Sequence, residues 1–443
     1  MTMKAWRLSF CLMLGAALAS GGEKPQPEYA LHGTTDKPVA IYQPGEEMVF
    51  TLKVLEDGKP VAGKKVKWTR NGDDGQRVTG EAVATVDGVP IKTKIAKPGF
   101  VRIVAEALGE DGKKLQGFRG GWGGNQYGDI FFEGGACAAP DKLTPGGEEP
   151  ADFDKFWEEI KADVAAVPMA AEVKELKTQS QNKLYAVKIP CAGPRPVTGY
   201  LSVPAGAKEK SLKAVVSFDG YGVHPWRPQW FVQDALHFHV NAHGMELEQS
   251  KEYYDQLTKE LANYAFKMEE NVDRKTAYFY GMACRLLRAF EYIKTRPEWN
   301  GKDLASDGGS QGGTQGLWGA AMVPGVTSAE IWSPGFCDLA GVKIGRLRGW
   351  RPDWTKALDY YDPVFVAKRI KTAKVHLIAN YGDYTCPPSG VWIVYNNLAT
   401  LKKSMEVKQG ARHDYTMKDF QSYVVTPDGI KDVQVKKEGP GRA

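Results

Sequence analysis

Asp307-Gly308-Gly309-Ser310-Gln311-Gly312-Gly313 is the stretch that decides the fold. It contains Gly-x-Ser-x-Gly, the pattern of a sharp turn between a strand and a helix with a serine at its tip. Glycines suit such a turn because its crowded backbone leaves little room for side chains. The turn sets the Ser310 hydroxyl near the positive end of the helix dipole. Because glycine-rich loops also match the pattern by chance, the nucleophile hypothesis requires a base and an acid elsewhere.

Two histidines follow Ser310, and an α/β-hydrolase places its base after its nucleophile. His376 lies inside the apolar run 375–378 and is predicted to be a sheet residue. His413 lies in a predicted turn directly after the expected strand 404–408. Because a loop at the end of a strand is where a catalytic histidine belongs, we favour His413 and keep His376 as the alternative.

Asp383 is the predicted acid. It follows the expected strand 375–380 through Tyr381-Gly382, so it lies on a loop at the carboxyl end of that strand. Gly-Asp is also ordinary turn chemistry, but the order serine, acid, histidine favours the catalytic interpretation. Asp414 is the residue next to His413 in the chain, where a contact that orients the imidazole would be awkward. Four further aspartates lie on segments that the pattern places less well: Asp338, Asp353, Asp359 and Asp362.

An oxyanion hole requires two backbone N–H groups. Gln311, the residue after the serine, is expected to supply one of them. The loop Asp219-Gly220-Tyr221-Gly222 follows the short apolar run 214–218, which is typical of a buried parallel strand. Tyr221 in this loop is expected to supply the second N–H group.

Strands and helices alternate from residue 150 to residue 443, which predicts an α/β fold with a mostly parallel central sheet. Ligands of such sheets bind at the carboxyl ends of the strands. The predicted strands are 185–189, 198–203, 214–218, 237–241, 302–307, 326–332, 375–380 and 404–408, and the predicted helices are 152–167, 250–266, 276–295 and 392–403.

The region 20–119 is predicted to be an immunoglobulin-like β-sandwich, because short alternating runs are separated by turns every ten residues or so. Residues 48–55 alternate in this way, and Asp57-Gly58 indicates a hairpin. No catalytic constellation appears there, so we expect a structural role and keep sugar binding as the alternative. The Gly- and Pro-rich segment 120–149 is predicted to be a connector between this region and the α/β domain.

Residues 1–19 are typical of a cleaved export signal. Lys4 and Arg7 precede an apolar run that is too short to span a bilayer, and Ala17-Leu18-Ala19 is a cleavage site. No later stretch is long and apolar enough for a transmembrane helix. We therefore expect a secreted or periplasmic protein without membrane insertion.

Composition excludes several classes of protein. A chain of 443 residues with 42% hydrophobic residues can bury a large core and form two or three domains. The net charge of +5 is too weak and dispersed to argue for nucleic acid. After residue 19 the cysteines are odd in number and without metal-ligand spacing, so we predict no metal, cofactor or disulfide scaffold and leave one or two disulfides open. These cysteines are Cys137, Cys191, Cys284, Cys337 and Cys386.

These motifs together resemble the acetyl xylan esterase / cephalosporin C deacetylase family of carbohydrate esterases. The resemblance covers roughly residues 150–425. The segments that carry it are the Ser-Gln-Gly-Gly elbow at 308–313, the segment Asp383-Tyr384-Thr385-Cys386-Pro387-Pro388-Ser389, His413, the tripeptide Gly220-Tyr221-Gly222, and the first helix with Phe153, Phe156 and Trp157.

The resemblance implies an α/β-hydrolase in which Ser310, His413 and Asp383 remove acetyl groups from sugar hydroxyls or small acetylated compounds. It also implies that Tyr221 and Gln311 are the oxyanion donors. The sequence departs from the family where its usual Arg-Gly-Gln reads Ala242-His243-Gly244-Met245, where its His-Glu reads His413-Asp414, in the N-terminal β-region, and in the segment 246–274. These departures concern specificity and the family's ring-like oligomer, so the oligomeric state is not predicted.

The acyl pocket is expected to be small, with Tyr221, Trp226 and Trp230 as walls, and the acceptor side to be open and aromatic. Candidates for shaping that side are His243, Trp122 and Tyr127, and a loop-packing role is kept as the alternative for His243. The predicted substrate is an acetylated carbohydrate or another small acetyl ester. The alternatives are a general carboxylesterase or peptidase on the same fold and, against the evidence of a complete triad, an inactive sugar-binding protein.

Overall fold

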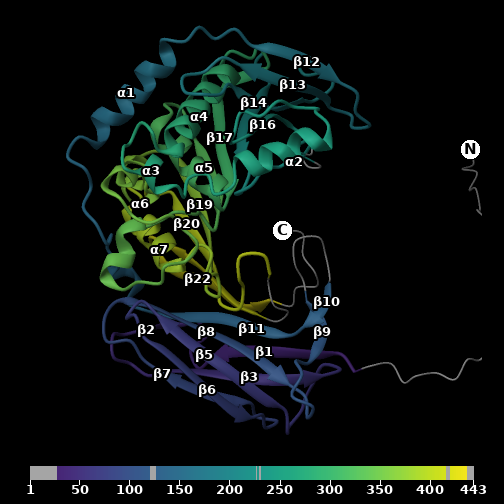
Figure 1. Ribbon diagram of the computed structural model, residues 1–443, viewed down its shortest axis with the longest axis vertical. Coiled ribbons are helices and arrows are strands. Elements are labelled where there is room, and N and C mark those ends of the chain that lie inside the picture. Colours follow the sequence, from purple (N-terminus) through teal and green to yellow (C-terminus); the bar gives the residue numbers. More distant parts are fainter. Residues whose placement is uncertain (1–26, 120–125, 226, 229–230, 416–419, 437–443) are drawn as a thin grey trace, which may run out of the picture.

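The structure is a computed structural model that describes residues 27–119, 126–225, 227–228, 231–415 and 420–436. An N-terminal all-β part lies against one end of a larger α/β part, which is coloured teal to yellow in Figure 1. The chain leaves the N-terminal part after β11 (Phe131–Ala138) and runs along the outside of the α/β part through α1 (Phe153–Ala165). The order of the two parts, all-β and then α/β, is the one that the sequence predicts.

Two sheets form the N-terminal part. One joins β1, β3, β4 and β7, and the other has the order β2-β11-β8-β5-β6, with the ribbon β10-β9 beside them. In β3 the side chains of Met48, Phe50, Leu52 and Val54 are buried, as the alternation of this segment predicts. The strands are β1 Tyr29–Thr35, β2 Ile41–Tyr42, β3 Met48–Glu56, β4 Lys59–Pro60, β5 Lys65–Gly72, β6 Arg77–Val83, β7 Val89–Thr93, β8 Gly99–Leu108, β9 Gln116–Arg119, β10 Gln126–Asp129 and β11 Phe131–Ala138.

The glycine-rich segment 120–149 is not a plain connector. Within it, β11 pairs antiparallel with β8 along its full length, so the N-terminal sheet extends past the predicted boundary at residue 119. Its glycines lie where the α/β part comes close. A Cβ on Gly135 would lie 2.6 Å from the Tyr381 carbonyl oxygen, and one on Gly134 would lie 2.9 Å from that of Gln409. These glycines therefore permit close packing between the two parts.

An eleven-stranded sheet with the order β12-β13-β14-β16-β15-β17-β18-β19-β20-β21-β22 forms the core of the α/β part. The strands from β16 to β20 in this order are parallel, and antiparallel strands flank them. The prediction of a mostly parallel central sheet is confirmed. The strands are β12 Glu172–Leu176, β13 Lys183–Ile189, β14 Val197–Val203, β15 Leu212–Phe218, β16 Ala235–Val240, β17 Trp299–Gly309, β18 Ser328–Trp332, β19 Lys374–Asn380, β20 Lys403–Lys408, β21 Phe420–Thr426 and β22 Gly429–Lys436.

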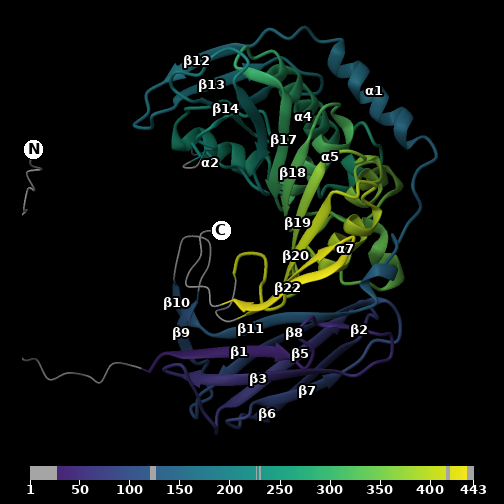
Figure 2. The ribbon, with the colours of Figure 1, turned by 180° about the vertical axis from the view of Figure 1, so that it is seen from behind.

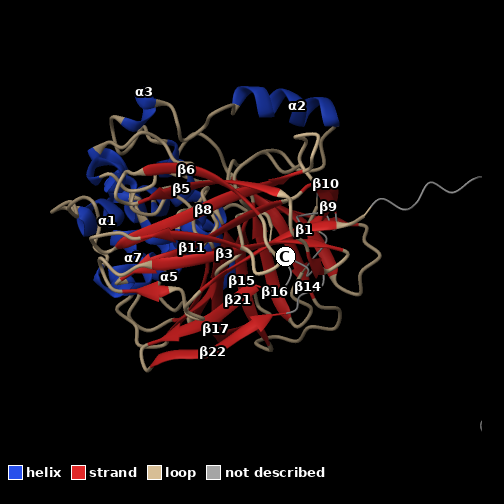
Figure 3. Cartoon of the chain, turned by 90° about the horizontal axis from the view of Figure 1, so that it is seen from below, coloured by secondary structure: helices blue, strands red, loops and turns tan. Residues whose placement is uncertain are grey.

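Helices pack on this sheet. Seen from behind, α1, α5 and α7 lie on the same side of strands β17 to β20 (Figure 2), and the view from below places them together, apart from α2 (Figure 3). The buried face of α1 contains the aromatic residues Phe153, Phe156 and Trp157 that its helical spacing predicts. The helices are α1 Phe153–Ala165, α2 Lys251–Glu260, α3 Met268–Asn271, α4 Tyr278–Lys294, α5 Gln311–Met322, α6 Pro363–Val366 and α7 Pro388–Asn397, with 3₁₀ turns η1 Pro140–Lys142, η2 Leu339–Ile344, η3 Lys356–Tyr360 and η4 Ala367–Arg369.

The helix predicted over residues 250–266 ends early. Ser250 caps α2, accepting a hydrogen bond from the Tyr253 N–H group, but the helix stops at Glu260. Beyond it, Asn263 and Ala265 have φ angles of 57° and 64°, which a right-handed helix does not contain. The prediction was wrong at this end, because the backbone leaves the helical conformation after Glu260.

The N-terminal part contacts the loops at the carboxyl ends of β19 and β20. Arg102 donates from Nε to the Gly382 carbonyl oxygen at 2.9 Å, and the Phe100 ring packs edge-on against Tyr381. Glu133 on β11 pairs with Arg102 at 2.5 Å and with Arg412 at 3.4 Å. The residues held in this way directly precede Asp383 and His413, so the N-terminal sheet supports the loops that carry the predicted acid and base.

All five cysteines that follow residue 19 are unpaired in the structure. The disulfides left open by the sequence are therefore not formed. Within the described ranges, no helix combines the length and the apolar character that a membrane crossing would need.

Candidate active site

Ser310 occupies a sharp turn between β17 and α5, as its motif predicts. Its backbone has φ 56° and ψ −124°, a conformation that a residue with a side chain rarely adopts. Neighbouring glycines make the turn possible, because a Cβ on Gly308 would collide with the Gly312 carbonyl group. The Ser310 N–H group donates to the Trp332 carbonyl oxygen at 2.9 Å, and the Gly335 N–H group donates to the Ser310 carbonyl oxygen at 2.8 Å. The turn is thus fixed on both sides by backbone hydrogen bonds.

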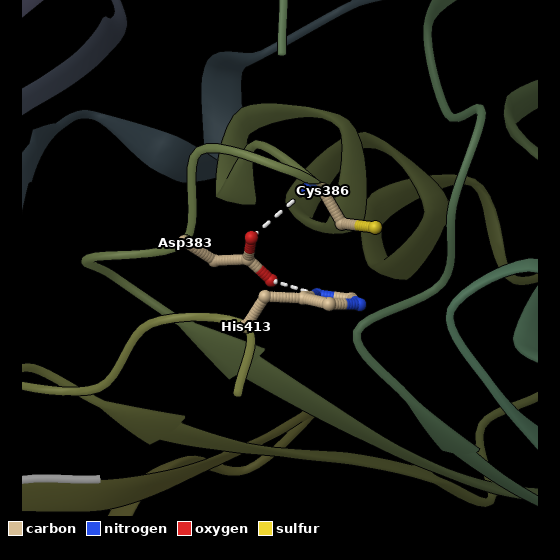
Figure 4. Close-up of side chains that lie close together, drawn as sticks. All are labelled: Asp383, Cys386 and His413. Carbon is tan, nitrogen blue, oxygen red and sulfur yellow. Dashed lines mark hydrogen bonds and ion pairs between the residues drawn. The ribbon is translucent and has the colours of Figure 1, made fainter. Parts of the chain in front are cut away.

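Ser310, His413 and Asp383 form one hydrogen-bonded chain. His413 Nε2 lies 3.1 Å from Ser310 Oγ, and His413 Nδ1 lies 2.8 Å from Asp383 Oδ2 (Figure 4 draws the latter pair). With Nδ1–H donating to the carboxylate, Nε2 of a neutral imidazole can accept the serine proton. The structure therefore brings together the three residues that sequence order and spacing selected.

The Asp383 carboxylate is completely buried. Its Oδ1 accepts a hydrogen bond from the Cys386 N–H group at 2.9 Å, and its Oδ2 faces the imidazole. Both oxygens are therefore engaged by donors, which fixes the carboxylate plane relative to His413.

The competing residues are bonded elsewhere. His376 is in β19, where its Nδ1 lies 2.8 Å from Ser404 Oγ. Asp414 pairs with Arg412 at 2.5 Å. The other aspartates have partners away from the serine: Asp338 with Arg346, Asp353 with Arg348, Asp359 with Trp354 Nε1, and Asp362 with the N–H groups of Asp338, Leu339 and Val364.

Two opposing effects act on the pKa of His413. Burial of the imidazole lowers it, but the Asp383 carboxylate and the adjacent Cys386 side chain together raise it more. The pKa of His413 therefore lies above its ordinary value of 6.5. Burial also raises the pKa of the Cys386 thiol above its ordinary value.

The predicted oxyanion donors border the serine. Gln311 is the first residue of α5, so its N–H group has no carbonyl partner within the helix. The loop after β15 passes beside the elbow, since a Cβ on Gly220 would lie 3.8 Å from Ser310 Cβ. Tyr221 in this loop stacks on Tyr264 with ring centroids 4.0 Å apart.

His243 lies behind the oxyanion loop instead of lining an open pocket. Its side chain is fully buried, with Nε2 2.8 Å from the Gly222 carbonyl oxygen and Nδ1 2.7 Å from the Tyr278 hydroxyl. Burial lowers the pKa of His243 to about 4, so the neutral imidazole donates from Nε2 and accepts at Nδ1. These contacts correspond to the loop-packing alternative for His243, since the imidazole bonds the loop backbone.

Most other predicted pocket residues, Trp122, Trp226 and Trp230, lie outside the described residues. Tyr127 is on β10, where it is exposed and packs edge-on against Phe118. Among described residues, the Trp350 ring lies against Tyr221, with centroids 4.3 Å apart.

Sequence reasoning assigned no site role to Tyr264, which bonds Gln311, or to Cys386, which bonds Asp383. Tyr264 lies in a segment predicted to be helical, and the Cys386 thiol was quoted only as part of a motif. Asp383, Cys386 and His413 offer ligand atoms within 4.8 Å of one another, with Asp383 and Cys386 on one loop and His413 on another (Figure 4). A metal ion bound by all three would compete with the hydrogen bond that holds the imidazole.

Comparison with known proteins identifies relatives of the α/β part. The family described as acetyl xylan esterase (AXE1) matches residues 141–344 and 350–426, more than half of the chain. Acetyl esterase Axe7A of Xylanibacter ruminicola is 27% identical over 290 residues, which are 60% of this chain and 64% of that protein. This chain therefore spans less than two thirds of the length of that relative.

A solved structure has the same fold. The acetyl xylan esterase from Paenibacillus sp. R4 superposes with a TM-score of 0.52 at 23% identity, over 62% of this chain and 93% of that one. At this identity the likeness concerns the α/β-hydrolase fold alone.

Proposed function

This chain belongs to the acetyl xylan esterase family, and on that premise we propose that it is an exported serine esterase that removes O-acetyl groups from carbohydrates. The observation that carries the proposal is the hydrogen-bonded chain from Ser310 through His413 to Asp383 at the carboxyl edge of a parallel sheet. Export is inferred from the sequence of residues 1–19.

The first half of the reaction forms an acyl-enzyme. His413 Nε2 takes the proton of Ser310 as Oγ attacks the acetyl carbonyl carbon. Asp383 stabilises the imidazolium that results. The negative charge that develops on the carbonyl oxygen is received by the N–H groups of Gln311 and Tyr221. His413 then gives its proton to the departing sugar oxygen, which leaves as a hydroxyl, and acetyl remains on Ser310 Oγ.

The second half uses the same groups. His413 removes a proton from a water molecule, which attacks the acetyl carbon of the acyl-enzyme. The tetrahedral intermediate again places its charge at the oxyanion hole. Its collapse returns the proton to Ser310 Oγ and releases acetic acid.

An acetyl group is the proposed acyl part because aromatic side chains crowd the oxyanion loop. The Tyr221 ring stacks on Tyr264 with centroids 4.0 Å apart and meets the Trp350 ring edge-on with centroids 4.3 Å apart. A closely walled pocket accepts a methyl group and rejects longer chains by steric overlap. The carbohydrate part of the proposal rests on family membership.

The test is acetate release from acetylated xylan, acetylated xylo-oligosaccharides and other acetylated sugars, beside a series of aryl esters from acetate to octanoate. The wild type should cleave acetate esters much faster than butyrate or longer esters and should deacetylate at least one glycan. Ser310→Ala should lose about four orders of magnitude or more in rate while melting like the wild type.

The outcomes separate the alternatives. A preference for butyrate or octanoate would favour a general carboxylesterase. Cleavage of aryl acetates without release from any acetylated sugar would remove the carbohydrate assignment alone. An inactive protein that binds acetylated glycans would favour the sugar-binding alternative.

A further inference from the structure

Tyr264 lies in an unfavourable turn behind the oxyanion loop. The residues on either side of it, Asn263 and Ala265, have φ angles of 57° and 64°. A non-glycine residue in this conformation is unfavourable and persists only where surrounding contacts hold it. The tyrosine is 2% exposed, and Asn271 Nδ2 donates to the Ala265 carbonyl oxygen at 2.9 Å. The fold thus maintains two unfavourable backbone conformations around one buried side chain.

The Tyr264 hydroxyl connects the two halves of the oxyanion hole. It accepts a hydrogen bond from the Gly222 N–H group at 2.9 Å and donates one to Gln311 Oε1 at 2.9 Å. Gly222 directly follows Tyr221, whose N–H group is one proposed donor, and Gln311 carries the other. Gln311 is itself buried, and its Nε2 has no hydrogen-bond partner in the described part of the chain. The hydroxyl is therefore the described contact that orients this amide.

The tyrosine ring adds a second connection. Tyr221 stacks on it at 4.0 Å with an interplanar angle of 8°, and the Tyr221 hydroxyl donates to the Tyr264 carbonyl oxygen at 3.0 Å. Burial raises the pKa of Tyr264 far above its ordinary value, so the hydroxyl keeps the proton that it donates to Gln311.

Histidines hold the remaining parts of this loop. Asp219 at its start lies 2.9 Å from His239 Nε2, and the Gly222 carbonyl oxygen accepts from His243 Nε2. The loop is thus fixed to β16 at its start and to His243 at its end. The Tyr264 hydroxyl adds a hydrogen-bonded link from Gly222 of this loop to Gln311 of α5.

We propose that Tyr264 is a positioning residue for ester hydrolysis, whose hydroxyl sets the separation of the Tyr221 and Gln311 N–H groups. An oxyanion hole works because its donors are already in place when charge develops, so a change in their spacing lowers transition-state binding more than substrate binding. The inference rests on the proposed function, because it concerns the same reaction. It names a residue outside the triad and outside the two donors.

The experiment compares Tyr264→Phe with Tyr254→Phe. Phenylalanine keeps the ring that stacks on Tyr221 and removes only the hydroxyl. Tyr254 is a matched control, because it is also buried, accepts from a backbone N–H group (Gln249, 3.2 Å) and donates to a carbonyl oxygen (Glu246, 3.0 Å), but neither partner borders the serine. Both variants lose a comparable buried hydroxyl, so their losses of stability should be similar.

Kinetics on an aryl acetate separate positioning from packing. Tyr264→Phe should lower kcat by about 10- to 100-fold, less than removal of an oxyanion donor, with KM nearly unchanged. The affinity for a methyl trifluoromethyl ketone, which adds to Ser310 and places an oxyanion in the hole, should fall by the same factor as kcat/KM. Tyr254→Phe should leave both quantities near wild type.

A second variant removes the other partner of the hydrogen bond between the Tyr264 hydroxyl and Gln311 Oε1. Gln311→Leu removes the acceptor of the Tyr264 hydroxyl and keeps the backbone N–H group. The double variant with Tyr264→Phe should be no slower than the slower single variant, since both remove one bond. If Tyr264→Phe does not fold, Gln311→Leu alone should show the loss of kcat and of ketone affinity.

The results distinguish the two proposals. An active wild type with Tyr264→Phe and Tyr254→Phe equally close to wild type overturns the positioning role alone. Additive losses in the double variant, or a change confined to KM, also overturn it. A wild type that cleaves no ester overturns the proposed function and this inference together.

Discussion

Asp383→Asn is the sharpest test of how the site works, because both carboxylate oxygens face donors. Oδ2 accepts from His413 Nδ1 at 2.8 Å, and Oδ1 accepts from the Cys386 N–H group at 2.9 Å. An asparagine side chain has one oxygen and one NH₂ group. Whichever way it turns, the NH₂ group faces one of these two donors.

The clash between the NH₂ group and a facing donor can be relieved only at the His413 imidazole. A backbone N–H group cannot move its proton, whereas a neutral histidine can hold its proton on either nitrogen. We therefore expect the asparagine oxygen to stay with Cys386 and the NH₂ group to donate to Nδ1, which forces the proton onto Nε2. Because Nε2 lies 3.1 Å from Ser310 Oγ, a proton there blocks transfer from the serine.

The wrong tautomer should lower kcat by about 10⁴-fold, equivalent to about 5 kcal/mol of activation free energy. The fold should survive, because the replacement has the same size and no charge. The measurements are kcat/KM on an aryl acetate and the labelling rate of Ser310 by a fluorophosphonate, which requires loss of the same proton. Both rates should fall by similar factors.

Asp414→Asn is the matched control, since this neighbour of His413 pairs with Arg412 at 2.5 Å and should tolerate the change within about threefold. Retention of more than about a tenth of wild-type activity by Asp383→Asn would refute the tautomer argument. An equal loss in Asp414→Asn would assign the effect to the loop instead of the carboxylate.

Three further outcomes are expected. His413→Ala should be nearly as inactive as Ser310→Ala in a steady-state assay, while His376→Ala in β19 should stay within about threefold of wild type, and the reverse pattern would make His376 the base. Because His413 must be neutral to act as the base and its pKa is raised, activity should increase with pH through a midpoint above 6.5. A pH–rate profile with no increase above pH 6.5 would contradict the assignment of His413. Dialysis against EDTA should preserve activity, whereas added Zn²⁺ should inhibit by competing for Asp383, Cys386 and His413; activity that chelation abolishes and zinc restores would point to a metal enzyme instead.

The sequence was most informative where one strand or turn decides the position of a residue. Ser310 lies at the carboxyl end of β17, Asp383 follows β19 and His413 follows β20. Because parallel strands bring their carboxyl ends to one edge, residues far apart in the chain could be assigned to one site from strand order alone. The same reasoning separated His413 from His376, since only a loop residue can turn toward this edge.

The sequence was least informative where packing between distant segments decides the conformation. The glycines of β11 are typical of a linker in the sequence. In the structure they lie so close to the carbonyl groups of Tyr381 and Gln409 that a side chain would collide with them. The apolar spacing of 250–266 continues past Glu260, although the backbone leaves the helix there. Tyr264 could not be assigned to the site, because its contacts with Gly222 and Gln311 depend on that unforeseen turn.

The unfavourable backbone conformations around the site require the rest of the fold to hold them. Among the described residues, positive φ angles occur at Ser310 in the elbow, at Ser333 just after the Trp332 carbonyl that accepts from the Ser310 N–H group, and at Asn263 and Ala265 on either side of Tyr264. The strands hold them through bonds such as Ser333 N–H to the Ile378 carbonyl oxygen, while the N-terminal sheet fixes the acid and base loops through Arg102 and Glu133. Strain at one residue persists only when its surroundings over-determine its position. The N-terminal part therefore supplies no side chain to the hydrogen-bonded chain of Ser310, His413 and Asp383, but its contacts with Gly382 and Arg412 hold the residues that directly precede Asp383 and His413.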